Sequence, residues 1–168
     1  MKFILACVFF VAVGLVLMEF IGLRINTTPS IPVTVYILDT GSIPKKGDII
    51  SICPPDDSLQ KLANERGYLA VSFRCPSRYT PLLKPLVAVA GDYVSVDQSI
   101  SINGVPVDAS TRMLADSDGR AMPNNAKSGI VPEGEVWLLS SYNPKSWDSR
   151  YYGSLPAENI QGVVRPLF

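Results

Sequence analysis

The stretch LLKPLVAVAGDYVSV, residues 82–96, decides the fold of this chain. It is apolar and rich in β-branched residues, and Gly91-Asp92 interrupts it, which predicts two strands joined by a turn. Alternating apolar residues continue on both sides of Asn103-Gly104, a dipeptide that is typical of a tight hairpin. The central part of the chain therefore has the pattern of an antiparallel β protein.

The remaining segments add strands and one helix to this centre. Short apolar runs predict further strands at residues 33–38, 49–53 and 135–140. One soluble helix is expected over residues 58–66, because apolar side chains recur there at helical spacing before Gly67. Residues 110–128 are polar and poorly periodic, which predicts a loop or insertion. The fold class is therefore mainly β, with one short soluble helix.

The first 24 residues read as a membrane anchor or a signal segment. Residues 3–23 are apolar except for Glu19, and this length is enough to span a bilayer as one transmembrane helix. The basic amino end favours the cytoplasm, although Arg24 after the segment weakens that asymmetry. Apolar residues continue past a weak cleavage site at 12–14, so an uncleaved anchor is favoured over a removed signal. Residues 25–168 are then expected to form one periplasmic domain.

Composition excludes several classes of function. Fifteen Lys and Arg balance fifteen Asp and Glu, so no broad basic surface is expected for a nucleic acid partner. Histidine is absent, which removes the commonest zinc ligand and every Ser-His-Asp or Cys-His site. Of the three cysteines, Cys7 lies in the leading segment. We therefore expect no metal site and no cofactor.

The other two cysteines, Cys53 and Cys75, have two interpretations. In an oxidising periplasm they would form a disulfide that contributes about 3 kcal/mol on the chain-entropy model. Alternatively they are two buried free thiols, which behave as small hydrophobic side chains. The expected compartment favours the disulfide.

A hydrolase without histidine needs another base, and a neutral lysine amine can take that role. An ordinary lysine is neutral in only about one molecule in 2,500 at pH 7, so such a lysine must be buried. Lys84 is the candidate, because apolar residues surround it in the sequence. Taken alone, Lys84 is better explained as an edge-strand lysine in contact with water, and Ser30 as a turn serine between prolines.

Three motifs in a fixed order change this interpretation. They are TPSIP at residues 28–32, KPLVAVAGD at 84–92 and SWDSRYYG at 146–153. Together they resemble the signal peptidase family of serine-lysine proteases, with Lys145 in place of the asparagine that precedes the third motif in that family. The third motif is the specific one. The resemblance implies a signal-peptidase-like β-barrel or coiled-sheet domain behind the anchor.

The resemblance also implies catalytic roles. Ser30 would attack the scissile carbonyl, and Lys84 would take its proton and return it to the leaving amine. The backbone amide of Ser30 and the hydroxyl of Thr28 would bind the oxyanion. Ser146 matches the serine that orients the lysine.

Asp148 and Arg150 also gain a role from the resemblance. On the residues alone they would form a turn ion pair, worth about 0 to 1 kcal/mol if exposed. In the family, the matching carboxylate is often counted with the catalytic pair, so Asp148 is a catalytic candidate. Arg150 is implied to support the wall of the active site.

Departures from the family pattern point to a subgroup. Housekeeping signal peptidases carry Gly-Asp-Asn where this chain has Ser-Ser-Tyr at 140–142, and they place two residues between the nucleophile and the next proline rather than one. The single anchor and Cys-Pro-Pro at 53–55 are more similar to TraF-like peptidases of conjugative plasmids. That similarity implies processing of pilin or other exported precursors at the bacterial inner membrane, alongside the conjugative secretion apparatus. Cyclisation of the pilin is one outcome of such an acyl-enzyme.

Two other functions remain as alternatives. The departures at 140–142 argue against a general type I signal peptidase, and the presence of Ser30, Lys84 and Asp148 argues against a non-catalytic, anchored assembly factor. A self-cleaving regulator would need a DNA-binding segment where the apolar leader stands. The sequence leaves open the substrate, the choice between hydrolysis and cyclisation, and the oligomeric state.

Overall fold

The computed structural model describes residue 4 and residues 7–10, 13–14, 21–32 and 34–167. Seven strands form a larger sheet: β1 (Leu23–Ile25), β2 (Val35–Asp39), β3 (Ile49–Ile52), β4 (Leu82–Val89), β9 (Glu135–Leu138), β10 (Leu155–Pro156) and β11 (Ile160–Pro166). Four strands form a smaller sheet: β5 (Tyr93–Val96), β6 (Ile100–Ile102), β7 (Val105–Pro106) and β8 (Gly129–Ile130). The helical elements are α2 (Ser58–Glu65), α3 (Ser149–Tyr152) and the 3-10 turn η1 (Ala157–Asn159).

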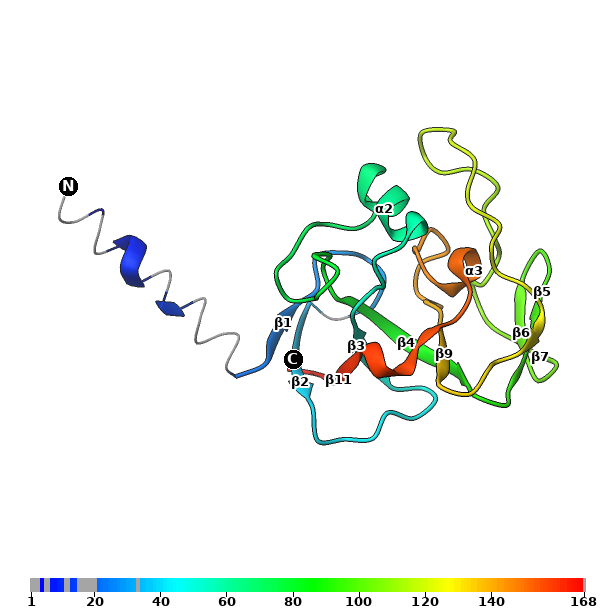
Figure 1. The fold of residues 1–168 in the computed structure, drawn as a ribbon, viewed down its shortest axis with the longest axis horizontal. Coiled ribbons are helices and arrows are strands. Elements are labelled where there is room, and N and C mark those ends of the chain that lie inside the picture. The colour runs from blue at the N-terminus through cyan, green and yellow to red at the C-terminus, as the bar shows by residue number, and fades with distance from the viewer. Residues whose placement is uncertain (1–3, 5–6, 11–12, 15–20, 33, 168) are drawn as a thin grey trace.

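Both sheets are antiparallel (Figure 1). The strand order is β1-β2-β11-β3-β4-β9-β10 in the larger sheet and β7-β6-β5-β8 in the smaller one. The mainly β prediction is confirmed. The expectation of one soluble helix is incomplete, because α3 and η1 accompany α2.

Strand β4 lies inside the larger sheet, between β3 and β9. Its side chains are alternately buried and half-buried, so Lys84 lies on the same buried face as Leu82 and Leu86. Only 4% of Lys84 is exposed. The interpretation of Lys84 as an edge-strand lysine is therefore wrong, because β4 is not an edge and its buried face holds this side chain.

The turn at Gly91-Asp92 joins the two sheets, since β4 belongs to the larger and β5 to the smaller. Gly91 has a positive φ of 88°, a conformation that favours glycine. The Asp92 carboxylate accepts hydrogen bonds from the Val89 amide at 3.0 Å and from the Asn103 side chain at 2.7 Å. It also pairs with Lys46 at 2.8 Å. The Gly-Asp end of the second motif therefore has a structural role, because it forms the turn that connects the two sheets.

Strand β11 lies between β2 and β3, a position that the sequence did not predict. Val163 and Val164 are buried, but Gly162 and Pro166 interrupt the apolar pattern around them. A Cβ atom at Gly162 would lie 2.5 Å from the carbonyl oxygen of Asp39. Glycine is thus required at this close approach between β11 and the end of β2.

Helix α2 begins at the predicted residue, Ser58, and ends at Glu65, one residue before the predicted end. The Asp57 carboxylate caps it by accepting hydrogen bonds from the amides of Leu59 at 2.9 Å and Gln60 at 2.8 Å. The helix stops at Glu65, and Gly67 follows with a φ of 77°. Helix α3 has only four residues, too few for a periodic pattern to reveal it.

Much of the predicted anchor at 3–23 lies outside the described residues, and so does Val33. Within the described part of the chain, no helix combines the length and the apolar character needed to cross a bilayer. Ile21 and Gly22 form a turn, and Leu23 begins β1. The division of the chain at residue 24 stays a prediction.

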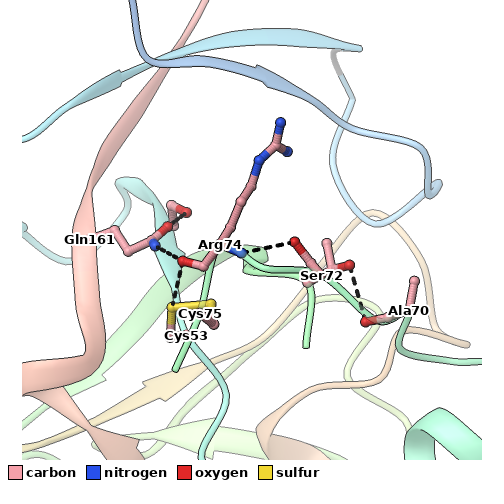
Figure 2. Close-up of a disulfide and its surroundings, with 8 residues drawn as sticks. Cys53, Ala70, Ser72, Arg74, Cys75 and Gln161 are labelled. Carbon is pink, nitrogen blue, oxygen red and sulfur yellow. Dashed lines mark hydrogen bonds between the residues drawn. A yellow bond between two sulfur atoms is a disulfide. The ribbon is translucent and has the colours of Figure 1, made fainter. Parts of the chain in front are cut away.

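A disulfide joins Cys53, just after β3, to Cys75 in the loop between α2 and β4, with 5.5 Å between the Cα atoms. Figure 2 shows it beside Arg74, whose carbonyl oxygen accepts a hydrogen bond from the Gln161 side chain at 3.1 Å. Both connections tie the 67–81 loop to the sheet. Cys7 is a free thiol.

Replacing Cys53 and Cys75 together by serine is expected to lower the free energy of unfolding by about 3 kcal/mol, because the unfolded chain loses a covalent constraint. Urea unfolding of the full chain, with and without reductant, measures this difference. Cys7→Ser is the matched control and should unfold like the wild type. Equal stability of the oxidised and reduced chains would contradict the prediction.

Candidate active site

A cleft of about 510 Å³ opens beside β4. Its walls are drawn from four segments of the chain, within residues 24–30, 66–84, 113–122 and 143–151. The cleft brings together four residues predicted to act in the site: Thr28, Ser30, Lys84 and Ser146. Two others, Asp148 and Arg150, do not line it and are fully buried. Among the residues described, no group of three or more His, Cys, Asp or Glu side chains is arranged to hold a metal ion.

Ser30 is presented by the loop between β1 and β2, and only 6% of it is exposed. Asn26 holds this loop in shape. Its amide nitrogen donates to the Ile31 carbonyl at 3.2 Å, and its oxygen accepts from the backbone and the hydroxyl of Thr28, both at 3.1 Å. Sequence reasoning did not select Asn26, although an asparagine two residues before a threonine is a known signal for such a turn.

The hydroxyls of Thr28 and Ser30 lie 3.0 Å apart. A hydroxyl has one hydrogen to donate, and that of Thr28 is used on Asn26. Ser30 therefore donates to Thr28. For Thr28 to stabilise an oxyanion, as the resemblance implies, its hydroxyl would have to rotate away from Asn26.

The amine of Lys84 donates a hydrogen bond to the Ser146 hydroxyl at 2.7 Å. Burial lowers the pKa of Lys84 from 10.5 to about 8, against the opposing effect of the nearby Asp148 charge. With that pKa, about one amine in ten is neutral at pH 7. The lysine is therefore far better suited to accept a proton than an exposed lysine would be.

Ser30 and Lys84 line the same cleft, but each is bonded to a different hydroxyl. In the part of the chain that is described, no hydrogen bond joins the Ser30 hydroxyl to the Lys84 amine. Contacts between catalytic groups often form only when substrate is bound. Direct proton transfer from Ser30 to the amine therefore requires the Ser30 hydroxyl to give up its hydrogen bond with Thr28.

Asp148 and Arg150 form a two-pronged buried ion pair behind the cleft. Arg150 Nε lies 2.7 Å from Asp148 Oδ1, and Arg150 Nη2 lies 3.0 Å from Asp148 Oδ2. Neither side chain is exposed. The guanidinium also donates to four backbone carbonyls, those of Ala109, Thr111, Ser140 and Pro144. The ion pair expected from the residues is present, but it is buried rather than exposed, because the third motif is folded into the core.

Ser140 links this ion pair to the loop that carries Ser30, and sequence reasoning missed it as a functional residue. Its amide donates to Asp148 at 3.1 Å, and its carbonyl accepts from Arg150 at 2.7 Å. Its hydroxyl donates to the Ser30 carbonyl at 2.5 Å. The only sequence signal was the departure from Gly-Asp-Asn at 140–142. Within the described structure Asp148 forms no hydrogen bond with Ser30 or Lys84, so its connection to the Ser30 loop runs through Ser140.

Ser140→Ala is expected to lower kcat about tenfold to a hundredfold, because the buried Ser30 carbonyl loses its partner and Ser30 loses its fixed position. KM should change little. Steady-state cleavage of a peptide substrate measures both constants. Ser140→Thr restores a hydroxyl and should recover activity, while the exposed Ser141 serves as a matched alanine control. A wild-type kcat for Ser140→Ala would show that the Ser140 hydroxyl is not needed to hold Ser30 in its catalytic position.

The loop predicted at 110–128 forms one wall of the cleft. The Tyr68 hydroxyl donates to Asp116, which also pairs with Arg120 at 2.6 Å. The Tyr68 ring lies 5.7 Å from the ring of Trp147, next to Ser146. The Met113 amide donates to the Tyr151 hydroxyl at 3.2 Å. These contacts fix the wall to Tyr68, just after α2, and to the third motif.

Comparison with known proteins shows which family the chain resembles. The model of the family "Signal peptidase, peptidase S26" matches residues 1–168. The conjugal transfer protein TraF of Agrobacterium fabrum is 40% identical over 148 residues, which cover 88% of this chain and 82% of the relative. The plasmid transfer protein TraF of Escherichia coli is 35% identical over 148 residues, covering 87% and 82%. A crystal structure of a signal peptidase I from Enterococcus faecalis V583 matches 74% of this chain and 98% of that chain, with 24% identity and a TM-score of 0.41.

Proposed function

Because the chain belongs to the signal peptidase family, peptidase S26, we propose that it is a membrane-bound serine endopeptidase that uses Ser30 and Lys84 to process exported precursors for conjugative transfer. Its relatives are named conjugal and plasmid transfer proteins, which supports the role in conjugation. The family membership supports the peptidase activity.

One observation carries the catalytic part of the proposal: a buried lysine of lowered pKa lines the same cleft as a nearly buried serine. An exposed lysine would have ended the proposal, because its amine would be protonated at neutral pH. The hydrogen bond from Lys84 to Ser146 holds the amine on the cleft side of β4. Lys84 lies on the buried face of β4, which explains why the amine has so little contact with water.

The reaction follows from these groups. Ser30 Oγ attacks the scissile carbonyl carbon while its proton passes to the neutral Lys84 amine. The resulting ammonium returns that proton to the leaving amine as the peptide bond breaks, which leaves an ester on Ser30. Water or the amino terminus of the substrate then attacks the ester, and the proton passes again through Lys84. The first route gives a linear product and the second a cyclic one.

The proposed substrate is a pilin or another exported precursor, processed on the periplasmic side of the inner membrane beside the conjugative secretion apparatus. Ser30 lies five residues beyond the end of β1, at the start of the folded domain. If residues 3–23 cross the membrane, the connection to Ser30 reaches at most about 25 Å. The cleft would then lie close to the lipid surface, where a membrane-bound precursor is within reach.

Mass spectrometry of the pilin tests the proposal. In donor cells with the wild-type gene, we expect the pilin to lack the segment that it retains in a donor from which the gene is deleted. A cyclic product would be lighter than the linear one by the mass of one water. Identical pilin masses in the two donors would contradict the proposed function, and rescue of a signal-peptidase-deficient strain would show a general peptidase instead.

A further inference from the structure

The side chain of Asn26 bridges the loop that carries Ser30. Its amide nitrogen donates to the carbonyl oxygen of Ile31, the residue after Ser30, at 3.2 Å. Its oxygen accepts from the backbone amide of Thr28, two residues before Ser30, at 3.1 Å. One planar amide group therefore holds the backbone on both sides of the proposed nucleophile, in a loop that lines the cleft.

These contacts require an amide at position 26. The nitrogen must face the Ile31 carbonyl because that group can only accept, and the oxygen must face the Thr28 backbone amide because that group can only donate. A carboxylate would lose the donor, and an apolar side chain would lose both bonds. The backbone of the loop therefore determines which way the Asn26 side chain is turned.

This orientation sets the direction of the hydroxyl bonds in the site. The Asn26 oxygen also lies 3.1 Å from the Thr28 hydroxyl, and because an amide oxygen has no hydrogen, Thr28 is the donor. Thr28 is then the acceptor for the Ser30 hydroxyl, which lies 3.0 Å away. Asn26 thus ends a short chain of hydrogen bonds that starts at the proposed nucleophile.

Asn26 and Ser140 hold different atoms of the same loop. The Ser140 hydroxyl reaches the Ser30 carbonyl from the core, at 2.5 Å. The Asn26 side chain acts from within the loop, on the residues that flank Ser30. Because the two anchors share no atom of the loop, neither can replace the other.

We propose that Asn26 is a positioning residue for Ser30. It holds the loop in the shape that presents the nucleophile to the cleft, and it directs the Thr28 hydroxyl that accepts from Ser30. It acts through the backbone and through Thr28, and not on the reacting atoms. Its effect on catalysis rests on the proposed function, whereas its hold on the loop does not.

Asn26→Ala is expected to lower kcat about tenfold to a hundredfold, because Thr28 and Ile31 lose their partner and Ser30 loses its fixed position. KM should change little. Steady-state cleavage of a peptide substrate by the full chain measures both constants, and circular dichroism shows whether each chain is folded at the assay temperature. Asn125→Ala replaces an exposed asparagine outside the cleft and should keep the wild-type kcat.

A double-mutant cycle tests the effect on the hydroxyls. Thr28→Val removes the hydroxyl and keeps the branched shape of the side chain. Asn26→Ala should reduce kcat by a smaller factor in the Thr28→Val chain than in the wild type, because one of its hydrogen bonds is already absent there. Equal factors in the two chains would overturn the role of Asn26 in directing the hydroxyls.

Hydrogen exchange separates this inference from the proposed function. The full chain with Ser30→Ala has no nucleophile, so exchange is measured without cleavage. Adding Asn26→Ala should speed exchange of the Thr28 backbone amide about threefold to tenfold, while adding Asn125→Ala should leave it unchanged. If the wild type cleaves no peptide but exchange follows this pattern, the hold on the loop stands and the peptidase proposal fails. Unchanged exchange, or a wild-type kcat for the folded Asn26→Ala chain, would overturn the inference.

Discussion

Ser30→Ala is expected to abolish processing of the precursor, with a loss in kcat on the order of 10⁴ or more, because no nucleophile remains to form the acyl-enzyme. The fold should survive this change. Ser140 bonds the backbone carbonyl of residue 30, which alanine keeps, and only the contact with the Thr28 hydroxyl is lost. The measurements are precursor mass in donor cells and cleavage by the purified full chain.

Two controls make this result specific. The melting temperature of Ser30→Ala should equal that of the wild type, which would exclude unfolding as the cause. Ser99→Ala, an exposed serine outside the cleft, should process normally. Processing at the wild-type rate by the folded Ser30→Ala chain would refute the role of Ser30.

Lys84→Met is expected to remove activity to a similar degree and, at the same time, to stabilise the protein. The folded-state pKa of about 8 lies below the ordinary 10.5, so the fold resists protonation of this amine. As pH falls from about 10.5 to about 8, the unfolded chain takes up a proton that the folded chain does not, and stability decreases. Below that window the full cost of about 3 kcal/mol applies. Methionine avoids this cost, so the free energy of unfolding should rise. The hydrogen bond with Ser146 is lost, which makes the gain smaller.

The pH profile of the wild type gives a second measurement on Lys84. Because only the neutral amine accepts a proton, kcat/KM should rise with pH and level off above the pKa of about 8. Urea unfolding of both chains at neutral pH measures the stability difference. Lys61→Met replaces an exposed lysine and serves as the matched control. A flat profile across this range, or an active Lys84→Met chain, would contradict the role of Lys84 as the base.

Local signals in the sequence predicted the parts of the fold that depend on neighbouring residues. Gly91-Asp92 and Asn103-Gly104 are turns, and α2 begins at Ser58 and stops before Gly67, as its sequence indicated. The position of β11 could not be predicted in this way. It lies between β2 and β3, which are far from it in the chain, and Gly162 hides its apolar pattern.

The same distinction between local signals and distant contacts applies to the candidate active site. Motif order was enough to predict that Thr28, Ser30, Lys84 and Ser146 share one cleft. It did not reveal that Ser140 carries the connection from the ion pair to Ser30, because a serine hydroxyl gives no sign in sequence of its distant partner. The burial of Arg150 was equally hidden, since five groups from several segments must fold around it before its charge is satisfied.

The position of β11 in the larger sheet has a consequence for the order in which the chain folds. Strand β2, which with β1 flanks the Ser30 loop, joins the larger sheet only through β11. Until residues 160–166 have paired with β3 as strand β11, strand β2 and the loop that carries Ser30 cannot join the sheet that contains β4. The Ser30 loop is therefore expected to reach its place beside Lys84 only after the last strand of the chain has folded.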